Sequence, residues 1–588
     1  MEAAIALLGG SAPVLSIAVL MLAPGLAFAP LLPARAAASP VTALAAASAL
    51  GFGATSVLLV TMSSFGVDLD GISVRIAIGV LVVAACAIPA RERADREVGE
   101  GWAAAGLGIA LLLGVLLQER VIGGSPVPGN DWAKYVLYAD EIRESGSLLI
   151  DNPYWLLGVP FREDPGVPSV YGAFLAMTGQ GAAVVAHGIW LFAVASILSI
   201  YALVRTLWGL RAGVIAALLW AVLPISQDIL GWHGLANQAA LALLPLVLLY
   251  AAEALGGQVD RRAVGGFALV VVAVFASHRL SAAVTVGALA LTAIVAVPLR
   301  GAHVLRWGAT AAGMAVVLGA GVAYDLYERN RTFDGSQGYE AYLSQKITWD
   351  LVARDFTYAF SAVAVLSALW LVYAAVRRRA ELRDPVALVP IAALLVVVVG
   401  LGYAWVLHIP NAYVRMVYYL PLVAVPVVAV ALVTLLPRRG PLVAAAALAA
   451  AVLSVSWGQA ENVRSLYAFA SPASVRGLDA LEARLRPDEV VVTDRCWSFL
   501  ATWLLHTRTL PALTPADIQP KAEVRLAEMG REIMSGSAEG RALADDLGVR
   551  YLVIDPTCRD EEREFLRPPL FADPLYASKR LVIATIRD

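Results

Sequence analysis

Histidine and arginine side chains interrupt apolar stretches of this sequence at two places where they could bind a phosphate group. His278 and Arg279 lie in SHRLSA, between two apolar runs, and Arg415 lies in HIPNAYVRMVYYL, where another apolar run begins. An ionisable side chain near lipid is costly unless it faces water, a carboxylate or a phosphate. Arginine suits a phosphate because its guanidinium fork donates two hydrogen bonds. The alternative is that these cations only extend from helix ends to a membrane interface.

Two aspartates lie at similar positions, where an apolar run gives way to a polar loop. Asp131 begins the helical stretch DWAKYVLYADEIRES, and Asp228 lies in the short turn SQDILGWHGLANQ together with Trp232 and His233. A carboxylate, an imidazole and three amides in so short a segment are hard to explain by solubility alone. The alternatives are that Asp131 is only the N-cap of its helix, and that Asp228 is a solvated side chain beside an interfacial tryptophan.

The helix that Asp131 begins is predicted to be amphipathic. Its apolar positions are Trp132, Val136, Ala139 and Ile142, and its polar face carries Asp140, Glu141 and Glu144. A helix with this spacing is typical of a segment that lies along a membrane surface.

Composition places the whole chain in a membrane. Of its 588 residues, 59% are apolar and 15% are charged, whereas soluble chains carry about 25% charged residues. The mean hydropathy is +0.73. These values exclude a soluble enzyme, a disordered chain and a nucleic-acid-binding protein, and the net charge of -2 gives no sign of an anionic polymer as partner.

About fourteen apolar runs of roughly 17 to 24 residues are predicted to be membrane-spanning helices. They lie near residues 11–33, 41–62, 73–90, 101–117, 182–204, 212–226, 237–255, 263–277, 282–299, 307–324, 355–376, 385–407, 416–436 and 441–457. Arginines concentrate on alternate connections, which predicts that these connections are cytoplasmic. The external segments are then 118–181, 226–236, 278–281, 325–354, 408–415 and the tail after 457.

The tail differs from the rest of the chain. From residue 458 onward, predicted strands and helices alternate, which indicates an external α/β domain of about 130 residues. Two predicted strands end at Asp494 and Asp555, and Cys496 and Cys558 follow them closely; a third strand is predicted in KRLVIATIRD, residues 579–588. The two cysteines could form a disulfide in an oxidising compartment, or could be packed separately. The fold class is therefore mainly α: three membrane helices in 1–100, a membrane core in 101–457, and the α/β domain in 458–588.

Over about residues 101–588 this organisation resembles the GT-C-fold integral membrane glycosyltransferases, of an actinobacterial type. The resemblance rests on GNDWAKYVLYADEIRESGSLLIDNPYW, in which an acidic residue precedes an amphipathic helix in the first large external loop. It rests also on Asp228, in the loop where the family carries a second acidic residue. No DD pair follows Gly129 and no WWDYG motif is present, which argues against an oligosaccharyltransferase.

The resemblance implies an inverting transfer of a sugar from a polyprenyl-phosphate-linked donor to an external glycan, lipid or protein acceptor of the cell envelope. It makes Asp131 the candidate general base. Asp228 would share that role, orient the acceptor, or help Asp131 to hold a divalent cation such as Mg²⁺ or Mn²⁺. The candidate substrate contacts are Tyr135, Trp232, His233, His278, Arg279 and Arg415. The expected location is a bacterial plasma membrane, with the tail in the periplasm or outside the cell.

Three other classes of protein stay open at this point. A transporter or flippase would place ionisable residues near the bilayer midplane and often shows internal repeats. A polymerase or ligase of lipid-linked envelope glycans would use similar substrates without the acidic first loop. A non-catalytic scaffold for cell-wall assembly would need no reactive side chains.

Overall fold

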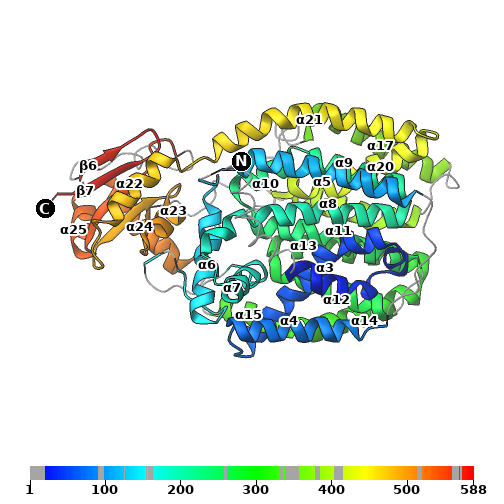
Figure 1. The fold of residues 1–588 in the computed structure, drawn as a ribbon, viewed down its shortest axis with the longest axis horizontal. Helices are drawn as coiled ribbons and strands as arrows, with labels where there is room; N and C mark the ends of the chain where they lie inside the picture. The colour runs from blue at the N-terminus through cyan, green and yellow to red at the C-terminus, as the bar shows by residue number, and fades with distance from the viewer. Residues whose placement is uncertain are drawn as a thin grey trace.

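The computed structural model describes residues 20–89, 99–124, 126–153, 155–156, 163–256, 261–331, 336–337, 356–377, 385–402, 415–512, 519–558, 569 and 572–587. Residues 11–19 of the first predicted span, the basic segment at 91–96 and most of the loops 325–354 and 408–415 lie outside the described residues. The described chain is mainly helical, as predicted, and all but one of its strands lie in the C-terminal part (Figure 1).

Residues before 467 form a bundle of long apolar helices that lie lengthwise beside one another (Figure 1). Its α-helices are α2 (Ala34–Ala37), α3 (Pro40–Ser64), α4 (Gly71–Cys86), α5 (Glu100–Ile122), α6 (Asp131–Ser145), α7 (Gly166–Thr178), α8 (Ile189–Trp208), α9 (Leu210–Val222), α10 (Ile225–Trp232), α11 (Leu235–Leu255), α12 (Arg261–Ser277), α13 (Arg279–Arg300), α14 (Ala302–Leu318), α15 (Ala320–Arg331), α17 (Tyr358–Arg377), α18 (Leu388–Gly402), α20 (Pro421–Leu435) and α21 (Gly440–Leu466). Short 3-10 helices are η1 (Ala29–Leu31), η2 (Ala182–His187), η5 (Pro385–Ala387) and η7 (Met416–Tyr419).

The number of spans differs from the predicted fourteen. Among the described residues, eight helices are long and apolar enough to cross a membrane, or up to ten if each of two bent pairs counts as one span. The pairs are α9 with α10, bent by 48°, and α14 with α15, bent by 61°. Apolar runs in the sequence overestimate the count because some of them fold as helices too short for a full span, such as α4 and α18.

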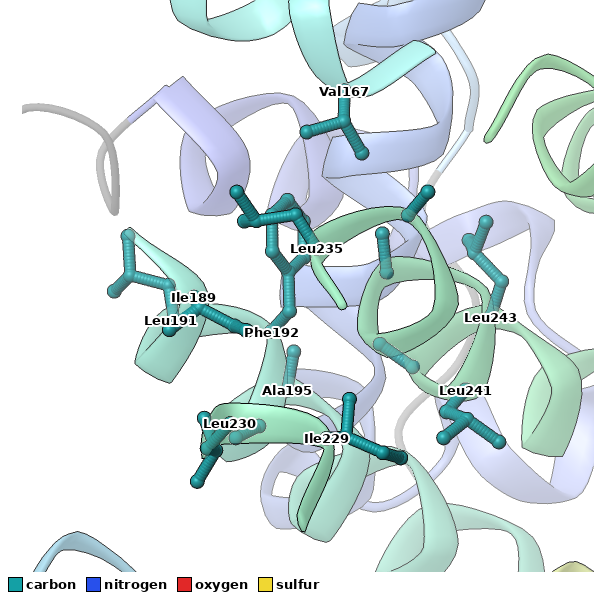
Figure 2. Close-up of a cluster of buried hydrophobic side chains, with 14 of the residues drawn as sticks. Val167, Ile189, Leu191, Phe192, Ala195, Ile229, Leu230, Leu235, Leu241 and Leu243 are labelled. Atoms are coloured by element: carbon teal, nitrogen blue, oxygen red, sulfur yellow. The ribbon is translucent and has the colours of Figure 1, made fainter. Parts of the chain in front are cut away.

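The centre of the bundle is built around α8 and α11. α11 is apolar on all sides, and its most apolar 18-residue window is entirely buried, as expected for a helix surrounded by other helices. Figure 2 shows how side chains of the short helices α7 and α10 join this core. The labelled residues are Val167 from α7, Ile189, Leu191, Phe192 and Ala195 from α8, Ile229 and Leu230 from α10, and Leu235, Leu241 and Leu243 from α11.

The C-terminal part is an α/β domain, as the alternating pattern predicts. Its helices are α22 (Pro472–Glu482), α23 (Ser498–Leu505), α24 (Lys521–Ser535) and α25 (Ala538–Asp546). Its sheet has the order β3 (Leu510–Ala512), β2 (Val490–Asp494), β5 (Val549–Ile554), β7 (Val582–Ile586) and β6 (Ala572–Ala577). β2 is parallel to β3 and β5, whereas β7 is antiparallel to β5 and β6.

The two strands that the sequence analysis missed are those at the edges of this sheet. β3 contains Pro511 and β6 contains Pro574. Proline cannot donate a ladder hydrogen bond and is confined largely to edge strands. The central strands β2, β5 and β7 were predicted because they are continuous apolar runs, and Val491, Val492 and Leu552 are fully buried.

The α/β domain is attached to the end of the bundle that carries α6 and α10 (Figure 1). The last helix of the bundle, α21, leads into the domain and ends at Leu466, nine residues beyond the predicted boundary at 457. Arg580 donates hydrogen bonds to the carbonyls of Ala468 (2.6 Å) and Ser465 (3.2 Å). The two-residue strand β1 (Ser336–Gln337) from the bundle pairs with β4 (Gln519–Pro520) of the domain. Contacts spread over several segments thus fix the domain on the bundle.

A disulfide joins Cys496, after β2, to Cys558, after β5. Of the two possibilities that the sequence left open, the structure has the bridged one. Because the bridge closes a 62-residue separation, it limits the freedom of the unfolded domain considerably.

We expect the variant Cys496→Ala/Cys558→Ala to lower the unfolding free energy of the α/β domain by about 2–5 kcal/mol, the usual cost of losing a native disulfide. Limited proteolysis of the purified full chain should show faster cleavage within residues 467–587. Cys86→Ser, which removes an exposed free thiol, is the control. Equal cleavage rates in the double variant and the control would contradict a stabilising role.

Candidate functional site

The turn that leads into α6 is fixed from both sides. Gly129 has φ +88°, and a Cβ atom there would lie 2.8 Å from the carbonyl oxygen of Gly231, so a larger residue does not fit. The Gly129 amide donates to the carbonyl of Tyr467 (2.7 Å). Asn130 Nδ2 donates to the Arg495 carbonyl (3.0 Å), and its Oδ1 accepts from the Leu500 amide (3.2 Å). The start of α6 is therefore held between the bundle and the α/β domain.

Asp131 is not the N-cap of this helix, contrary to the sequence analysis. Asn130 takes the N-cap position, and Asp131 is the first helical residue. The Asn130 side chain makes no capping bond because it is used to bind the α/β domain. An acid in the first turn still interacts favourably with the helix dipole.

The Asp131 carboxyl group is partly buried among charged side chains from several elements. Burial raises its pKa, and Lys134, Arg415 and Arg495 partly offset that rise, whereas Glu163 adds to it. Within the described ranges, no side chain donates a hydrogen bond to Asp131.

Adjacent acids, Glu163 and Asp164, connect α6 to α13. Lys134 Nζ lies 2.7 Å from Glu163 Oε1. Arg279 Nε lies 2.7 Å from Asp164 Oδ1, and the Arg279 amide donates to Asp164 Oδ2 (2.9 Å). Burial would raise the pKa of Glu163, but the charge of Lys134 lowers it below its ordinary value. Arg279, predicted as a phosphate contact, is thus paired with a carboxylate, while 45% of its side chain stays exposed.

His278 caps α13. Its Nδ1 accepts from the Ser281 amide (3.3 Å) and lies 2.8 Å from Ser281 Oγ, which in turn lies 2.7 Å from Tyr419 Oη. Burial, and then the charge of Arg415, lower the pKa of His278 to about 3. The ring is therefore neutral near pH 7, and with Nδ1 as acceptor its Nε2 carries the proton.

Asp228 lies on α10, just after the bend that separates this helix from α9, and it is buried. Its Oδ2 accepts a hydrogen bond from Tyr418 Oη (2.7 Å) and its Oδ1 from Tyr467 Oη (3.3 Å). Trp232 Nε1 donates to Tyr418 Oη (3.2 Å), and the Arg415 guanidinium lies 6.0 Å from the Trp232 ring centre. This chain of contacts links Asp228 to Arg415, whose charge also acts on Asp131.

Two other predicted substrate contacts have their side chains buried in the protein. His233 ends α10 with φ +66°, is fully buried, and its Nε2 lies 2.6 Å from the Ala186 carbonyl oxygen. Burial lowers its pKa to about 4. Tyr135 is 4% exposed, and the Lys134 ammonium lies 5.3 Å from its ring centre. Burial raises the pKa of this phenol. Both side chains are thus packed inside the protein, and their role as substrate contacts stays a prediction.

No group of three or more His, Cys, Asp or Glu side chains suited to a metal ion occurs among the described residues. Both oxygens of Asp228 are occupied by phenol hydrogen bonds. A cation held by Asp131 and Asp228 stays a prediction, and no step below depends on it.

The structure joins four of the eight predicted residues into one cluster and adds others. Asp131, His278, Arg279 and Arg415 lie together with Lys134, Glu163, Asp164 and Arg495, which the sequence analysis did not select. The spacing of Lys134, one helical turn after Asp131, was the signal that could have identified it. Glu163 and Asp164 stand together in FREDPG, between Pro160 and Pro165, but no local pattern in the sequence shows their partners.

No protein-family model and no curated protein matches this sequence. The structure, however, resembles solved membrane enzymes. ArnT from Cupriavidus metallidurans, solved with bound undecaprenyl phosphate, matches with a TM-score of 0.51 and 15% identity, over 83% of this chain and 98% of ArnT. The archaeal oligosaccharyltransferase AglB from Archaeoglobus fulgidus, solved with an inhibitory peptide and a dolichol phosphate, matches with a TM-score of 0.51 and 16% identity, over 78% of this chain and 70% of AglB. The chain has the GT-C fold.

A third solved structure with this fold comes from Mycobacteria. A mutant of the arabinofuranosyltransferase AftD from Mycobacteria matches with a TM-score of 0.53 and 17% identity, over 84% of this chain and 42% of AftD. This chain therefore corresponds to less than half of AftD. At such identities the likeness establishes the GT-C fold, which confirms the fold predicted from the acidic first loop and the topology.

We expect Tyr418→Phe to destabilise the chain by about 1–3 kcal/mol, because a buried carboxylate oxygen loses its hydrogen bond. Tyr467→Phe should cost less, since its bond to Asp228 is longer, 3.3 Å against 2.7 Å. Thermal unfolding of the detergent-purified chain is the measurement, with Tyr327→Phe at a 63% exposed tyrosine as the control. If Tyr418→Phe and the control melt alike, Asp228 does not depend on this bond.

Proposed function

We propose that this protein is a membrane glycosyltransferase that moves a sugar from a polyprenyl-phosphate-linked donor to a hydroxyl group of a cell-envelope glycan, lipid or protein. The observation that supports this most is the position of Asp131 in a GT-C fold. Its carboxylate lies at the end of the bundle, beside the charges of Lys134, Arg415 and Arg495. The lipid phosphates bound by ArnT and AglB support the class of donor.

The proposed step is an inverting displacement. The acceptor oxygen forms a bond to the anomeric carbon while the bond from that carbon to the phosphate oxygen breaks. Asp131 takes the acceptor proton, and the polyprenyl phosphate leaves with the bonding electron pair. Arg415, Lys134 and the Nε2–H group of His278 are the candidates to stabilise the phosphate charge as it develops.

The position of the cluster suits substrates that differ in solubility. A polyprenyl tail stays in lipid, whereas an acceptor sugar is in water, so the reaction needs a site where the bundle ends. The Asp131 cluster lies at the end of the bundle that carries α6 and the α/β domain (Figure 1). We assign this end to the outer face of a bacterial plasma membrane. Arg438 and Arg439 precede α21, and arginines next to a membrane helix favour the cytoplasmic side. The other end of α21 lies beside the site, where Tyr467 binds Asp228. The disulfide also suits an oxidising compartment.

A transporter or flippase is less well supported. Transporters place their substrate and ion sites near the bilayer midplane, on interrupted helices. In the described part of this chain the charged cluster lies instead at helix ends, at the starts of α6 and α13 and just before η7. Transfer of a labelled sugar from a polyprenyl-phosphate donor by the purified chain separates an enzyme from a flippase or a scaffold.

We expect Asp131→Asn to reduce turnover by roughly 10²-fold or more, the usual scale for losing general-base catalysis. Because Asp131 is a first-turn residue and not the cap, the stability loss should be no more than about 1 kcal/mol. Labelled-sugar transfer and thermal unfolding of the same preparation are the two measurements.

Glu144→Gln is the matched control for Asp131→Asn, because it neutralises an exposed carboxylate on the same helix. It should leave both transfer and melting unchanged. Near-normal transfer by Asp131→Asn would exclude Asp131 as the base and would leave Asp228 as the next candidate.

The assignment of the outer face predicts which surfaces a membrane-impermeant maleimide reaches. In a chain with Cys86 replaced by serine, Ser535→Cys in the α/β domain should be labelled in intact cells. Arg439→Cys, at the far end of α21, should be labelled only after lysis. Both side chains are exposed in the structure, so the reverse pattern would show that the orientation is wrong.

A further inference from the structure

A small polar cavity lies inside the helix bundle, where α5 and α8 meet the bent pair α9 and α10. It gives the centre of a water molecule about 10 Å³ of space, which is room for about one water. Its lining is mixed, because the apolar side chains of Leu117 and Leu230 lie beside polar ones. The polar side chains are those of Gln118, Ser196 and Gln227, and all five residues are buried. None of the described residues that line the cavity belongs to the Asp131 cluster.

The two glutamine amides in this cavity carry polar atoms that lack a protein partner. Among the described residues, no hydrogen-bonding group pairs with Gln118 Oε1 or with Gln227 Oε1 and Nε2. Gln118 is 6% exposed and Gln227 is 2% exposed. Because both ends of the Gln227 amide are unpaired, exchanging its oxygen and nitrogen atoms does not remove the deficit. A buried amide without a partner is costly, above all at membrane depth, where bulk water cannot reach it.

The serine hydroxyl in the same cavity cannot pair with these amides, because its own hydrogen bonds are complete. Ser196 Oγ donates to the Ala193 carbonyl (2.7 Å). It accepts hydrogen bonds from Trp220 Nε1 (2.9 Å) and from Gln238 Nε2 (3.2 Å). These three bonds use the one proton and both lone pairs of the hydroxyl group. The two glutamine amides therefore need a further partner.

The cavity lies at the bend that carries Asp228. Pro224 interrupts the helix between α9 and α10 and has no amide proton to donate. The carbonyl of Val222, just before the bend, accepts a hydrogen bond from Ser456 Oγ of α21 (2.6 Å). Just after the bend, Gln227 contributes to the cavity lining together with α5 and α8. Bends in membrane helices are commonly completed by such side chains and by ordered water.

We propose that this cavity is a binding site for one water molecule, which the amides of Gln118 and Gln227 hold and which joins α10 to α5 at the bend. A water molecule fits because it donates to the two Oε1 atoms and accepts from Gln227 Nε2. The space is too small for a larger ligand. The water would fix the helix turn that carries Asp228, the residue after Gln227. A transferase and a flippase with this bend would need the same water, so the site is independent of the proposed function.

A cryo-EM map of the full purified chain in nanodiscs, at a resolution that shows ordered water, tests the site directly. We expect a density peak about 2.7–3.2 Å from Gln118 Oε1 and from the amide group of Gln227. The peak should be absent in the variant Gln118→Met/Gln227→Met, which keeps the length of both side chains and removes their polar atoms. Two results would overturn the proposal: ordered water elsewhere in the bundle but no peak here, or a direct hydrogen bond between the two glutamines.

Thermal unfolding gives a second test, because the sign of the change depends on whether the amides are paired. With the water bound, Gln118→Met or Gln227→Met alone removes hydrogen bonds and should lower the melting temperature by about 1–3 °C. The double variant should melt close to the wild-type chain, since replacing all partners of a buried hydrogen bond by apolar groups is nearly neutral.

Gln180→Met, at an exposed glutamine in the loop after α7, is the control for these variants and should leave the melting temperature unchanged. Single variants at Gln118 and Gln227 that melt above the wild-type chain would show that the amides have no partner to lose, because removing an unpaired buried amide stabilises the fold. That result would contradict a bound water.

Discussion

The structure depends on one electrostatic constraint: a group of charges has to be kept at the end of an apolar bundle. Burying a carboxylate is costly unless cations and hydrogen bonds compensate for the lost water. Asp131 and Glu163 meet this condition through cations supplied by α6, by the start of η7 and by the α/β domain. Because these segments are far apart in the sequence, the cluster exists only when bundle and domain are assembled.

This dependence explains why the domain is fixed so firmly to the bundle. The side chain of Asn130, the residue before Asp131, makes no capping bond to α6 and instead binds the turn after β2. The lost capping bond costs about 1 kcal/mol, and two hydrogen bonds across the junction offset it. The disulfide next to this turn restrains the segment after β2 that Asn130 binds. A displacement of the domain would therefore also displace Asp131, because it is the residue that follows Asn130 in the chain.

Local patterns in the sequence predicted the elements well and their pairings poorly. Apolar runs located the helices, and the buried strands β2, β5 and β7 followed from their composition. The Lys134–Glu163 and Arg279–Asp164 pairs join residues that are 29 and 115 positions apart, and no periodicity reports such contacts. The N-cap of α6 was misplaced by one residue because Asn130 and Asp131 are equally good caps, and only the docked domain decides between them.

The environments of the two aspartates argue for different roles. Asp228 is buried, and each of its oxygens accepts a hydrogen bond from a phenol. Within the described residues no side chain donates a hydrogen bond to Asp131, and burial raises its pKa, which suits a base. Asp228 instead holds Tyr418, and through Trp232 it sets the place of the Arg415 guanidinium. In the proposed reaction we therefore assign proton transfer to Asp131 and the positioning of the Arg415 guanidinium to Asp228.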